Sequence, residues 1–126
     1  MPSFLTGAAV TRDVVQGLID LDTGHIIVRN LGKAKSEQQR RIAALLALRQ
    51  AVLTGTASVG QDELVSQCKN FSCYDSGNFT ANMSATKTDD DRAVFLKTED
   101  GWKVTAPGEA FLLAVVRGLL NPSGAT

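Results

Sequence analysis

Hydrophobic and polar positions change their spacing twice in the last third of the chain. Residues 94–97 and 102–104 are short runs rich in β-branched and aromatic side chains, and residues 98–101 separate them. The two runs predict strands joined by a tight turn, whose Asp-Gly pair tolerates a positive φ angle. Apolar positions up to Leu120 then recur at helical spacing and predict a closing helix.

The start of this closing helix carries three terminal signals. Thr105 is placed to cap the helix with its hydroxyl group. Pro107 lies in the first turn, where a missing N–H costs nothing, and Glu109 lies near the positive end of the helix dipole. The helix is therefore expected to begin directly after the second strand.

A long helix is predicted over residues 36–54. Ser36 and Gln39 have the spacing of a capping box, and Gly55 stops the helix after Thr54. One side of this helix is mostly apolar and is expected to face the core, with Ile42, Leu45, Leu46, Arg49, Val52 and Leu53. Three charged residues are expected to point away from it, namely Glu37, Arg40 and Arg41.

Two shorter helices are predicted next along the chain. The first covers residues 58–68, and the second covers residues 77–87 and is capped by Asp75 or Ser76. Three adjacent aspartates, residues 89–91, end the second of these helices. Adjacent side chains diverge, so these aspartates predict a solvated turn rather than a metal site.

The N-terminal part of the chain is less regular. Residues 1–10 fit either an ordered arm or a frayed end. Residues 14–19 could form a short helix capped by Thr11, but residues 17–29 are more typical of a β-hairpin that turns at residues 22–24. A two-stranded ribbon is marginal alone in water, so it must lie on the domain or on a second copy of it.

The predicted order is helix, helix, turn, helix, strand, strand, helix, and the stretch G-W-K-V-T-x-x-G-E closes the wing at residues 101–109. This arrangement resembles winged helix-turn-helix domains of the DNA-binding type over residues 36–120. The resemblance implies an α+β fold with a three-helix core, a two-stranded wing and a C-terminal helix. Residues 1–35 would be an N-terminal β-hairpin extension, and residues 121–126 a disordered tail.

The resemblance also implies a regulator of transcription that binds duplex DNA. The third helix would enter the major groove, and the wing would contact the neighbouring minor groove or backbone. Rotation by 100° per residue turns Phe79 and Met83 to the core and leaves small residues outside. The expected DNA-contacting residues are Asn78, Thr80, Ser84 and Lys87 on the helix, Lys97 and Lys103 on the wing, and Arg40 and Arg41.

The same helix supports a second interpretation. Its outer face carries Gly77, Ala81, Ser84 and Ala85, which are small enough to let another protein approach closely. Base edges are usually read by Arg, Lys, Asn or Gln, and this face has few of them. The alternative function is a winged-helix module for protein–protein interaction that does not bind DNA.

Charge weakens the nucleic-acid interpretation further. The chain has 13 Lys and Arg against 13 Asp and Glu, so its formal net charge is zero. Residues 1–53 carry seven basic and four acidic side chains, whereas the remainder carries six basic and nine acidic. A strongly basic footprint, which is typical of proteins that bind nucleic acid non-specifically, is absent from the sequence.

Few residues are suited to catalysis or metal binding. The single histidine, His25, and the two cysteines, Cys68 and Cys73, are too few for a four-ligand zinc site. Two buried thiols are the favoured interpretation, and a Cys68–Cys73 disulfide or redox switch is the alternative. Nucleophilic catalysis needs a nucleophile, a base and an orienting group. We therefore expect no enzyme activity, metal or cofactor.

Apolar segments bear on location and assembly. No run approaches the roughly 18 apolar residues of a membrane-spanning helix, and the N-terminus lacks the basic start of a secretory signal. These features predict a cytoplasmic protein without membrane contact. The closing helix is apolar all round, so Leu113, Val116 and Leu120 need a cover beyond the core, either the N-terminal hairpin or a second subunit. The hypothesis is a two-fold homodimer through this helix and the N-terminal segment.

Overall fold

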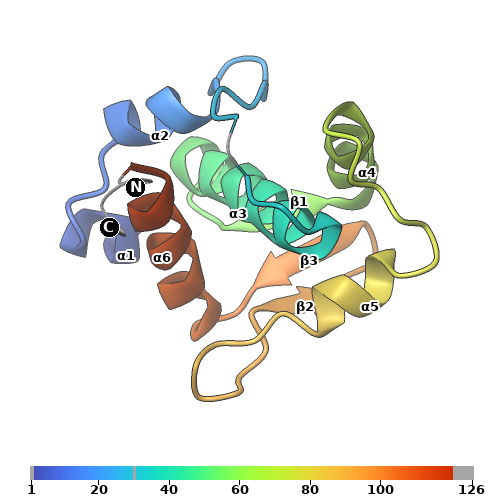
Figure 1. The fold of residues 1–126 in the computed structure, drawn as a ribbon. Helices are drawn as coiled ribbons and strands as arrows, with labels where there is room; N and C mark the ends of the chain where they lie inside the picture. Colours follow the sequence, from blue (N-terminus) through green and yellow to red (C-terminus); the bar gives the residue numbers. More distant parts are fainter. Residues whose placement is uncertain (1, 30, 121–126) are drawn as a thin grey trace.

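The chain folds around one long helix, α3 (Lys35–Thr54), which the other helices and a sheet surround (Figure 1). The computed structural model describes residues 2–29 and 31–120. Within them lie six helices and a three-stranded antiparallel sheet, so the fold is α+β as expected. None of these described helices combines the length and apolar character needed to cross a bilayer.

The sheet has the strand order β1-β3-β2 and pairs antiparallel throughout. The predicted strands are confirmed as β2 (Phe95–Lys97) and β3 (Gly101–Val104). The third strand, β1 (Ser58–Gly60), was expected to start a helix. Pairing with β3 takes these three residues instead, and the helix follows as α4 (Gln61–Asn70). Tertiary pairing therefore overrides the local helical signal.

Gly101 is required for close packing between strands and not for the positive φ angle that was expected. The residue does not adopt a positive φ angle, so the turn does not use it for that purpose. A Cβ atom at this position would lie 2.0 Å from the carbonyl oxygen of Val59 in β1. Glycine is needed here because the two strands approach each other closely.

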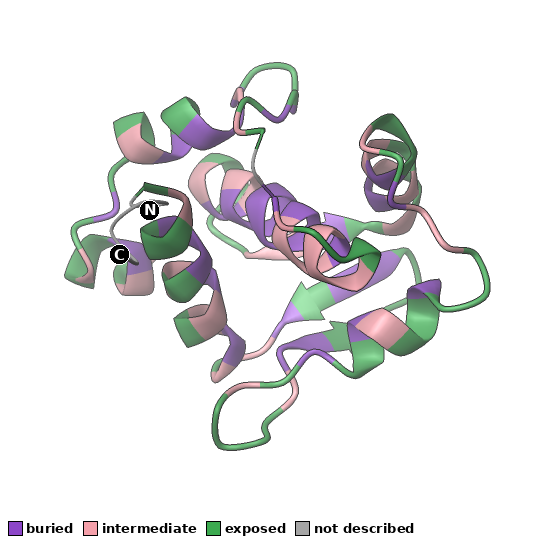
Figure 2. Cartoon of the chain, viewed as in Figure 1, coloured by how far each residue is buried: buried purple, intermediate pink, exposed green. Residues whose placement is uncertain are grey.

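Helix α3 is buried around its whole circumference in its middle part (Figure 2). Every residue from 42 to 48 is fully buried, so the core surrounds this part of the helix and does not cover only the one face that was expected. The predicted capping box is wrong, since Ala34 precedes the helix and no side chain caps its start. The predicted end is confirmed: Gly55 has a left-handed φ of 86°, and its N–H donates to the carbonyl of Ala51.

Two short helices replace the expected N-terminal hairpin. They are α1 (Ser3–Gly7) and α2 (Arg12–Leu18). The hydroxyl of Thr11 caps α2 by accepting a hydrogen bond from the N–H of Val14, at 3.2 Å. The predicted ribbon is reduced to one antiparallel bridge between Ile19 and Ile26. The capped helix buries Val15 and Leu18, the second of which belonged to the predicted ribbon.

Arg49 holds the loop between α2 and α3. Its Nε atom donates to the carbonyl of Leu21 at 2.9 Å, and Nη2 donates to the carbonyl of Asp22 at 3.2 Å. Nη1 lies 3.6 Å from a carboxylate oxygen of Glu63 in α4. Buried side chains of residues 5–31 belong to the same core as those of the later elements.

Helix α5 (Phe79–Ser84) has six residues and is shorter than the predicted segment 77–87. The carboxylate of Asp75 accepts from the N–H of Gly77 and from the side-chain amide of Asn78, which forms a turn before the helix. Lys87 pairs with Ala93 in an isolated β-bridge rather than continuing the helix. Hydrogen bonds from a side chain to the nearby backbone, such as that between Asp75 and the N–H of Gly77, compete with helix formation.

The closing helix is α6 (Gly108–Leu120). The predicted role of Thr105 is confirmed, because its hydroxyl oxygen accepts from the N–H of Gly108 at 2.9 Å. The same hydroxyl donates to the carbonyl of Ala93 at 2.6 Å, which ties the start of α6 to the chain before β2. The expected tail, residues 121–126, lies outside the described residues.

Candidate functional site

The outer face of α5 is exposed and built from small side chains. Phe79 and Met83 are buried, as the helical rotation predicted. The exposed residues on the other side are Thr80, Ala81, Ser84 and Ala85. Two hydrogen bonds orient the helix: the Nε2 atom of Gln39 donates to the carbonyl of Phe79, and Asn82 donates to Oε1 of Gln39. The face is therefore held firmly on α3.

Two polar residues expected on this face are placed at its ends. Asn78 is exposed, but its amide donates to the carboxylate of Asp75 at 2.9 Å. This hydrogen bond is the main cause that lowers the pKa of Asp75, with smaller contributions from backbone N–H groups. Lys87 is exposed and follows the last turn of the helix. It is the one cation among residues 77–87.

The two lysines of the β2–β3 hairpin, Lys97 and Lys103, lie on different faces of the sheet. Lys97 donates from Nζ to the carbonyl of Thr98 at 2.8 Å, and the ammonium lies 5.5 Å from the ring centroid of Trp102. Lys103 pairs with Leu96, which precedes Lys97 in β2. Neighbouring side chains along a strand point to opposite faces, so Lys103 and Lys97 lie on opposite faces of the sheet. The expected cationic wing is thus divided between two faces.

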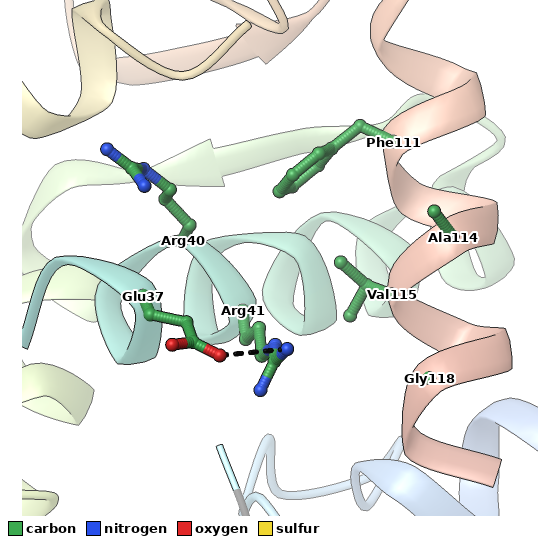
Figure 3. A pocket seen from close by; sticks show the side chains of 7 residues that line it. All are labelled: Glu37, Arg40, Arg41, Phe111, Ala114, Val115 and Gly118. Carbon is green, nitrogen blue, oxygen red and sulfur yellow. Dashed lines mark ion pairs between the residues drawn. The ribbon is translucent and has the colours of Figure 1, made fainter. Parts of the chain in front are cut away.

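Arg40 and Arg41 lie on α3, and both line a pocket together with residues of α6. They line a surface pocket of about 270 Å³ between α3 and α6 (Figure 3). Phe111 and Val115 point from α6 toward α3 in this pocket. Its lining residues are Glu37, Arg40, Arg41, Phe111, Ala114, Val115 and Gly118.

The two arginines of this pocket have different environments. Arg41 forms an ion pair with Glu37, with Nη2 and the carboxylate oxygen 2.9 Å apart. The Nε atom of Arg40 is buried and has no hydrogen-bond partner among residues 2–29 and 31–120. Leaving a buried donor unpaired costs about 1–3 kcal/mol. Arg40 therefore carries an unpaired donor that is closed off from solvent.

Sequence reasoning did not find this pocket. It treated Arg40 and Arg41 as exposed phosphate contacts, whereas both are half-buried. The missed signal lies in α6, where Ala114 and Gly118 share a side of the helix with Phe111. Two small residues beside one large ring leave room for a molecule at the surface.

Asp90, the middle one of the three aspartates after α5, is engaged within its own loop. Asp90 accepts a short hydrogen bond from the hydroxyl of Thr88 and forms an ion pair with Arg92 at 3.0 Å. The hydrogen bond from Thr88 is the main cause that lowers the pKa of Asp90. In the described part of the chain, no group of three or more His, Cys, Asp or Glu side chains is arranged to hold a metal ion.

Both cysteines are free thiols and both are buried, which confirms the favoured interpretation. Burial raises the pKa of the Cys68 thiol, and the neighbouring Cys73 raises it further. Burial also raises the pKa of Cys73. Thiolates are the reactive form of cysteine, so neither side chain is set up as a nucleophile at neutral pH.

The residues expected at a dimer interface differ in exposure. Val116 is 1% exposed and belongs to the core, so its predicted role in the interface is wrong. Val116 belongs to the same core cluster as buried side chains of α1, α2 and α3. Leu113 is half-buried, and Leu120 is 50% exposed. Leu120 therefore offers more exposed apolar surface than Leu113 does.

Charged and polar side chains are therefore spread over several surfaces, and two local features stand out: the small-residue face of α5 and the pocket between α3 and α6. The first carries hydrogen-bonding groups without much charge. The second is lined by Arg40, by the Arg41–Glu37 ion pair and by mostly apolar side chains of α6. No protein-family model, curated protein sequence or solved structure matches the chain.

Proposed function

We propose that residues 36–120 are a winged-helix domain that works as a protein-interaction module, with the exposed face of α5 as its contact surface. The element order α3-β1-α4-α5-β2-β3-α6 supports this fold. So does the strand order β1-β3-β2, in which the hairpin β2–β3 would be the wing. Helix α5 would occupy the position of the third helix.

The dispersal of positive charge around α5 carries the proposal. A protein that grips duplex DNA needs several Lys and Arg side chains on one surface, because phosphate contacts supply most of the affinity. Lys97 is bonded to its own turn, Lys103 lies on the other face of the sheet, and Arg40 lines the pocket on α6. Of the basic residues predicted to contact DNA, Lys87 is the one that directly follows α5 in the described chain.

The chemistry of the face fits a protein partner. Ala81 and Ala85 are exposed and allow close approach of another backbone, while the hydroxyls of Thr80 and Ser84 can donate and accept hydrogen bonds. Interfaces of this kind are depleted of charge at their centre. Gln39 already holds α5 in place, so the helix would lose little conformational entropy when a partner binds.

Site-specific photo-crosslinking in the source cells tests this function. A benzophenone side chain at Ala81 should give one discrete protein adduct that survives nuclease treatment. The same group at Asp13, exposed on α2 at the other end of the molecule (Figure 1), should not give it. An adduct at Ala81 that nuclease removes, or the same adducts from both positions, would refute the proposal.

DNA binding is the second candidate function, and one observation favours it. Thr80 and Ser84 are exposed on α5, with Asn78 before it and Lys87 after it, so four polar side chains follow one short segment. Such a domain would act as a regulator of transcription. Duplex binding at about 50 mM salt that falls steeply by about 200 mM would establish this function in place of the first.

A homodimer is compatible with either function. Leu113 and Leu120 leave apolar surface on α6 after folding. A second copy related by a two-fold axis would cover the same residues on both chains. We propose this assembly with Leu113 and Leu120 as its apolar contacts.

A further inference from the structure

We propose that Cys68 and Cys73 form a reversible disulfide that ties the end of α4 to the linker (residues 71–78) leading to α5 (Figure 1). Cys68 lies in the last turn of α4, and Cys73 lies three residues after the helix. They are the only two cysteines of the chain, so no third thiol of the same molecule competes for either. The structure shows the reduced form, in which both thiols are free.

The backbone at the end of α4 brings the two cysteines together. The N–H of Cys73 donates to the carbonyl of Cys68 at 2.9 Å. The N–H of Ser72 donates to the carbonyl of Lys69 at 3.1 Å, and Ser72 has a left-handed φ of 59°. These two nested hydrogen bonds form a Schellman motif, in which the side chains at the positions of Cys68 and Cys73 commonly contact each other.

The separation of the two residues fits a disulfide. The covalent bonds on either side of a 2.9 Å hydrogen bond limit the distance between the two Cα atoms to at most about 6.8 Å. Disulfides usually join Cα atoms that are about 4.4–6.8 Å apart. The Schellman motif therefore holds the backbone of both residues within the range that the bond requires.

The side chains also meet inside the protein. Both are fully buried and belong to the same core cluster. Burial is the main cause that shifts the pKa of each thiol, and a hydrogen bond between the two thiols is a further cause. The two sulfur atoms are thus neighbours before any oxidation takes place.

Exchange with a small disulfide, such as glutathione disulfide, supplies the oxidation. The Cys73 thiolate attacks one sulfur of glutathione disulfide, which forms a mixed disulfide and releases one glutathione thiolate. The Cys68 thiolate then attacks the sulfur of Cys73 and releases the second glutathione thiolate. The two glutathione thiolates take up, through water, the protons that the two protein thiols lose. Two protein thiols are oxidised, and one glutathione disulfide is reduced to two thiols.

The first attack requires the linker to open, because both thiols are buried in the closed chain. Cys73 is assigned this step because it lies outside the helix, so release of the linker exposes it while α4 keeps Cys68 in place. Closure of the linker then returns Cys73 to Cys68 and completes the bond. The fold thus slows oxidation but favours its product.

The disulfide strengthens the hold of the linker on both helices. The ring of Tyr74 in the linker lies 5.5 Å from that of Phe79 in α5, and the ammonium of Lys69 in α4 lies 5.3 Å from the centroid of the Tyr74 ring. A covalent bond at Cys73, next to Tyr74, restricts the opening of these contacts. Amide hydrogen exchange in residues 71–79 should therefore slow when the chain is oxidised. The bond itself does not depend on a partner at the outer face of α5.

Equilibration of the full chain in glutathione redox buffers tests the proposal. Acid quenching and intact-mass measurement give the fraction that has lost two hydrogen atoms, and peptide mapping assigns the bond to Cys68 and Cys73. The equilibrium constant for the disulfide should be at least about tenfold larger in the folded chain than in the same chain held unfolded in urea, because the fold already holds the two thiols together.

Single substitutions show that the two thiols act together. Cys68→Ala and Cys73→Ala should each accumulate the mixed disulfide with one glutathione, because no second thiol displaces it. Glutathione disulfide should slow amide exchange of residues 71–79 in the wild type and not in Cys68→Ala. The comparison of the folded and the urea-unfolded wild type decides the question even where a substituted chain does not fold.

Three results would overturn the proposal. One is an equilibrium constant in the folded chain that is equal to or smaller than the constant in urea. Another is a disulfide between two chains as the main product of oxidation. The third is unchanged amide exchange of residues 71–79 in the oxidised wild type, which would show that the bond does not restrain the linker.

Discussion

The side-chain amide of Gln39 donates a hydrogen bond to the carbonyl oxygen of Phe79, 2.9 Å away and 40 positions along the chain. Gln39 is fully buried, and its own oxygen accepts from the amide of Asn82 at 3.2 Å. One buried amide therefore fixes the whole of α5, which is too short to be stable alone. The orientation of the proposed contact face depends on this link.

Replacing Gln39 by leucine should lower the free energy of unfolding by about 1–3 kcal/mol. The substitution keeps the volume but leaves the buried carbonyl of Phe79 without its donor and the amide of Asn82 without its acceptor. Unpaired buried groups are costly. Urea denaturation measures the loss, and amide hydrogen exchange should accelerate in residues 79–84 more than elsewhere.

Gln50→Leu provides the matched control on the same helix. Gln50 is half-buried, and its side chain makes no hydrogen bond among the described residues. Its replacement should change stability by less than about 0.5 kcal/mol. Equal effects of the two substitutions would contradict the role given to Gln39.

Gly101→Ala should disrupt the pairing of β1 with β3. The added Cβ would meet the carbonyl oxygen of Val59 at 2.0 Å and the nitrogen of Gln61 at 2.9 Å, so the backbone must move. Overpacking of this kind costs about 1–3 kcal/mol or more. A lower thermal midpoint and a changed environment of Trp102, seen in its fluorescence, are expected, because this indole pairs with Gln61 at 3.1 Å.

Gly17→Ala serves as the comparison for this substitution. Nothing lies within 4 Å of a Cβ at Gly17, which is in helix α2. Alanine is the better helix former, so this variant should gain up to about 1 kcal/mol. A lower free energy of unfolding in Gly17→Ala, or an unchanged one in Gly101→Ala, would contradict the role given to the close contact between β1 and β3.

Local sequence signals predicted the C-terminal half of the fold well. The β2–β3 hairpin and the Thr105 cap follow from residues close to one another in the chain, and such signals act without knowledge of the rest. Strand β1 could not be predicted in this way, because its three residues are held by pairing with Lys103, Trp102 and Gly101 more than 40 positions later. The N-terminal hairpin failed because one capping hydroxyl, that of Thr11, favours a helix.

The site was harder to predict than the fold. Rotation of a helix correctly separated Phe79 and Met83 from the exposed face, since that separation needs only the helical period. The partners of Arg40 and Lys97 depend on which elements meet in space. Charge alone suggested phosphate contacts for both residues, whereas packing half-buries Arg40 on α3 and bonds Lys97 to its own turn.

Stability should fall at alkaline pH through the two thiols. Burial raises the pKa of Cys68 and of Cys73 in the folded chain, so the unfolded chain ionises first, near its usual value of about 8.5. The stabilisation is complete below that pH and declines above it by up to about 1.4 kcal/mol per pH unit for each thiol. Urea denaturation from pH 7 to pH 10 measures this slope.

The double substitution Cys68→Ala and Cys73→Ala separates this effect from other alkaline ionisations. It lowers stability at pH 7 by removing buried side chains, but its decline toward pH 10 should be shallower than that of the wild type. In the wild type, a thiol reagent at pH 8 should react only as fast as the chain opens. Parallel slopes in both proteins would rule out the thiols as the cause.

Association through α6 should depend on Leu113 and Leu120 and not on Val116. Leu120 is 50% exposed in the single chain, so Leu120→Glu places a charge at the proposed interface without disturbing the core. The dimer should then dissociate in sedimentation experiments at micromolar concentration, and the free energy of unfolding of the monomer should be unchanged. Leu113→Glu should act in the same direction.

Val116→Ala distinguishes the core from the interface on the same helix. Val116 is 1% exposed, and truncation of its side chain should cost about 2 kcal/mol of stability through lost burial. Its sedimentation behaviour should match the wild type, because the residue has no surface to offer a second chain. A wild-type protein that sediments as a monomer would reject the two-fold assembly, since the apolar surface on α6 would then need no partner of its own kind.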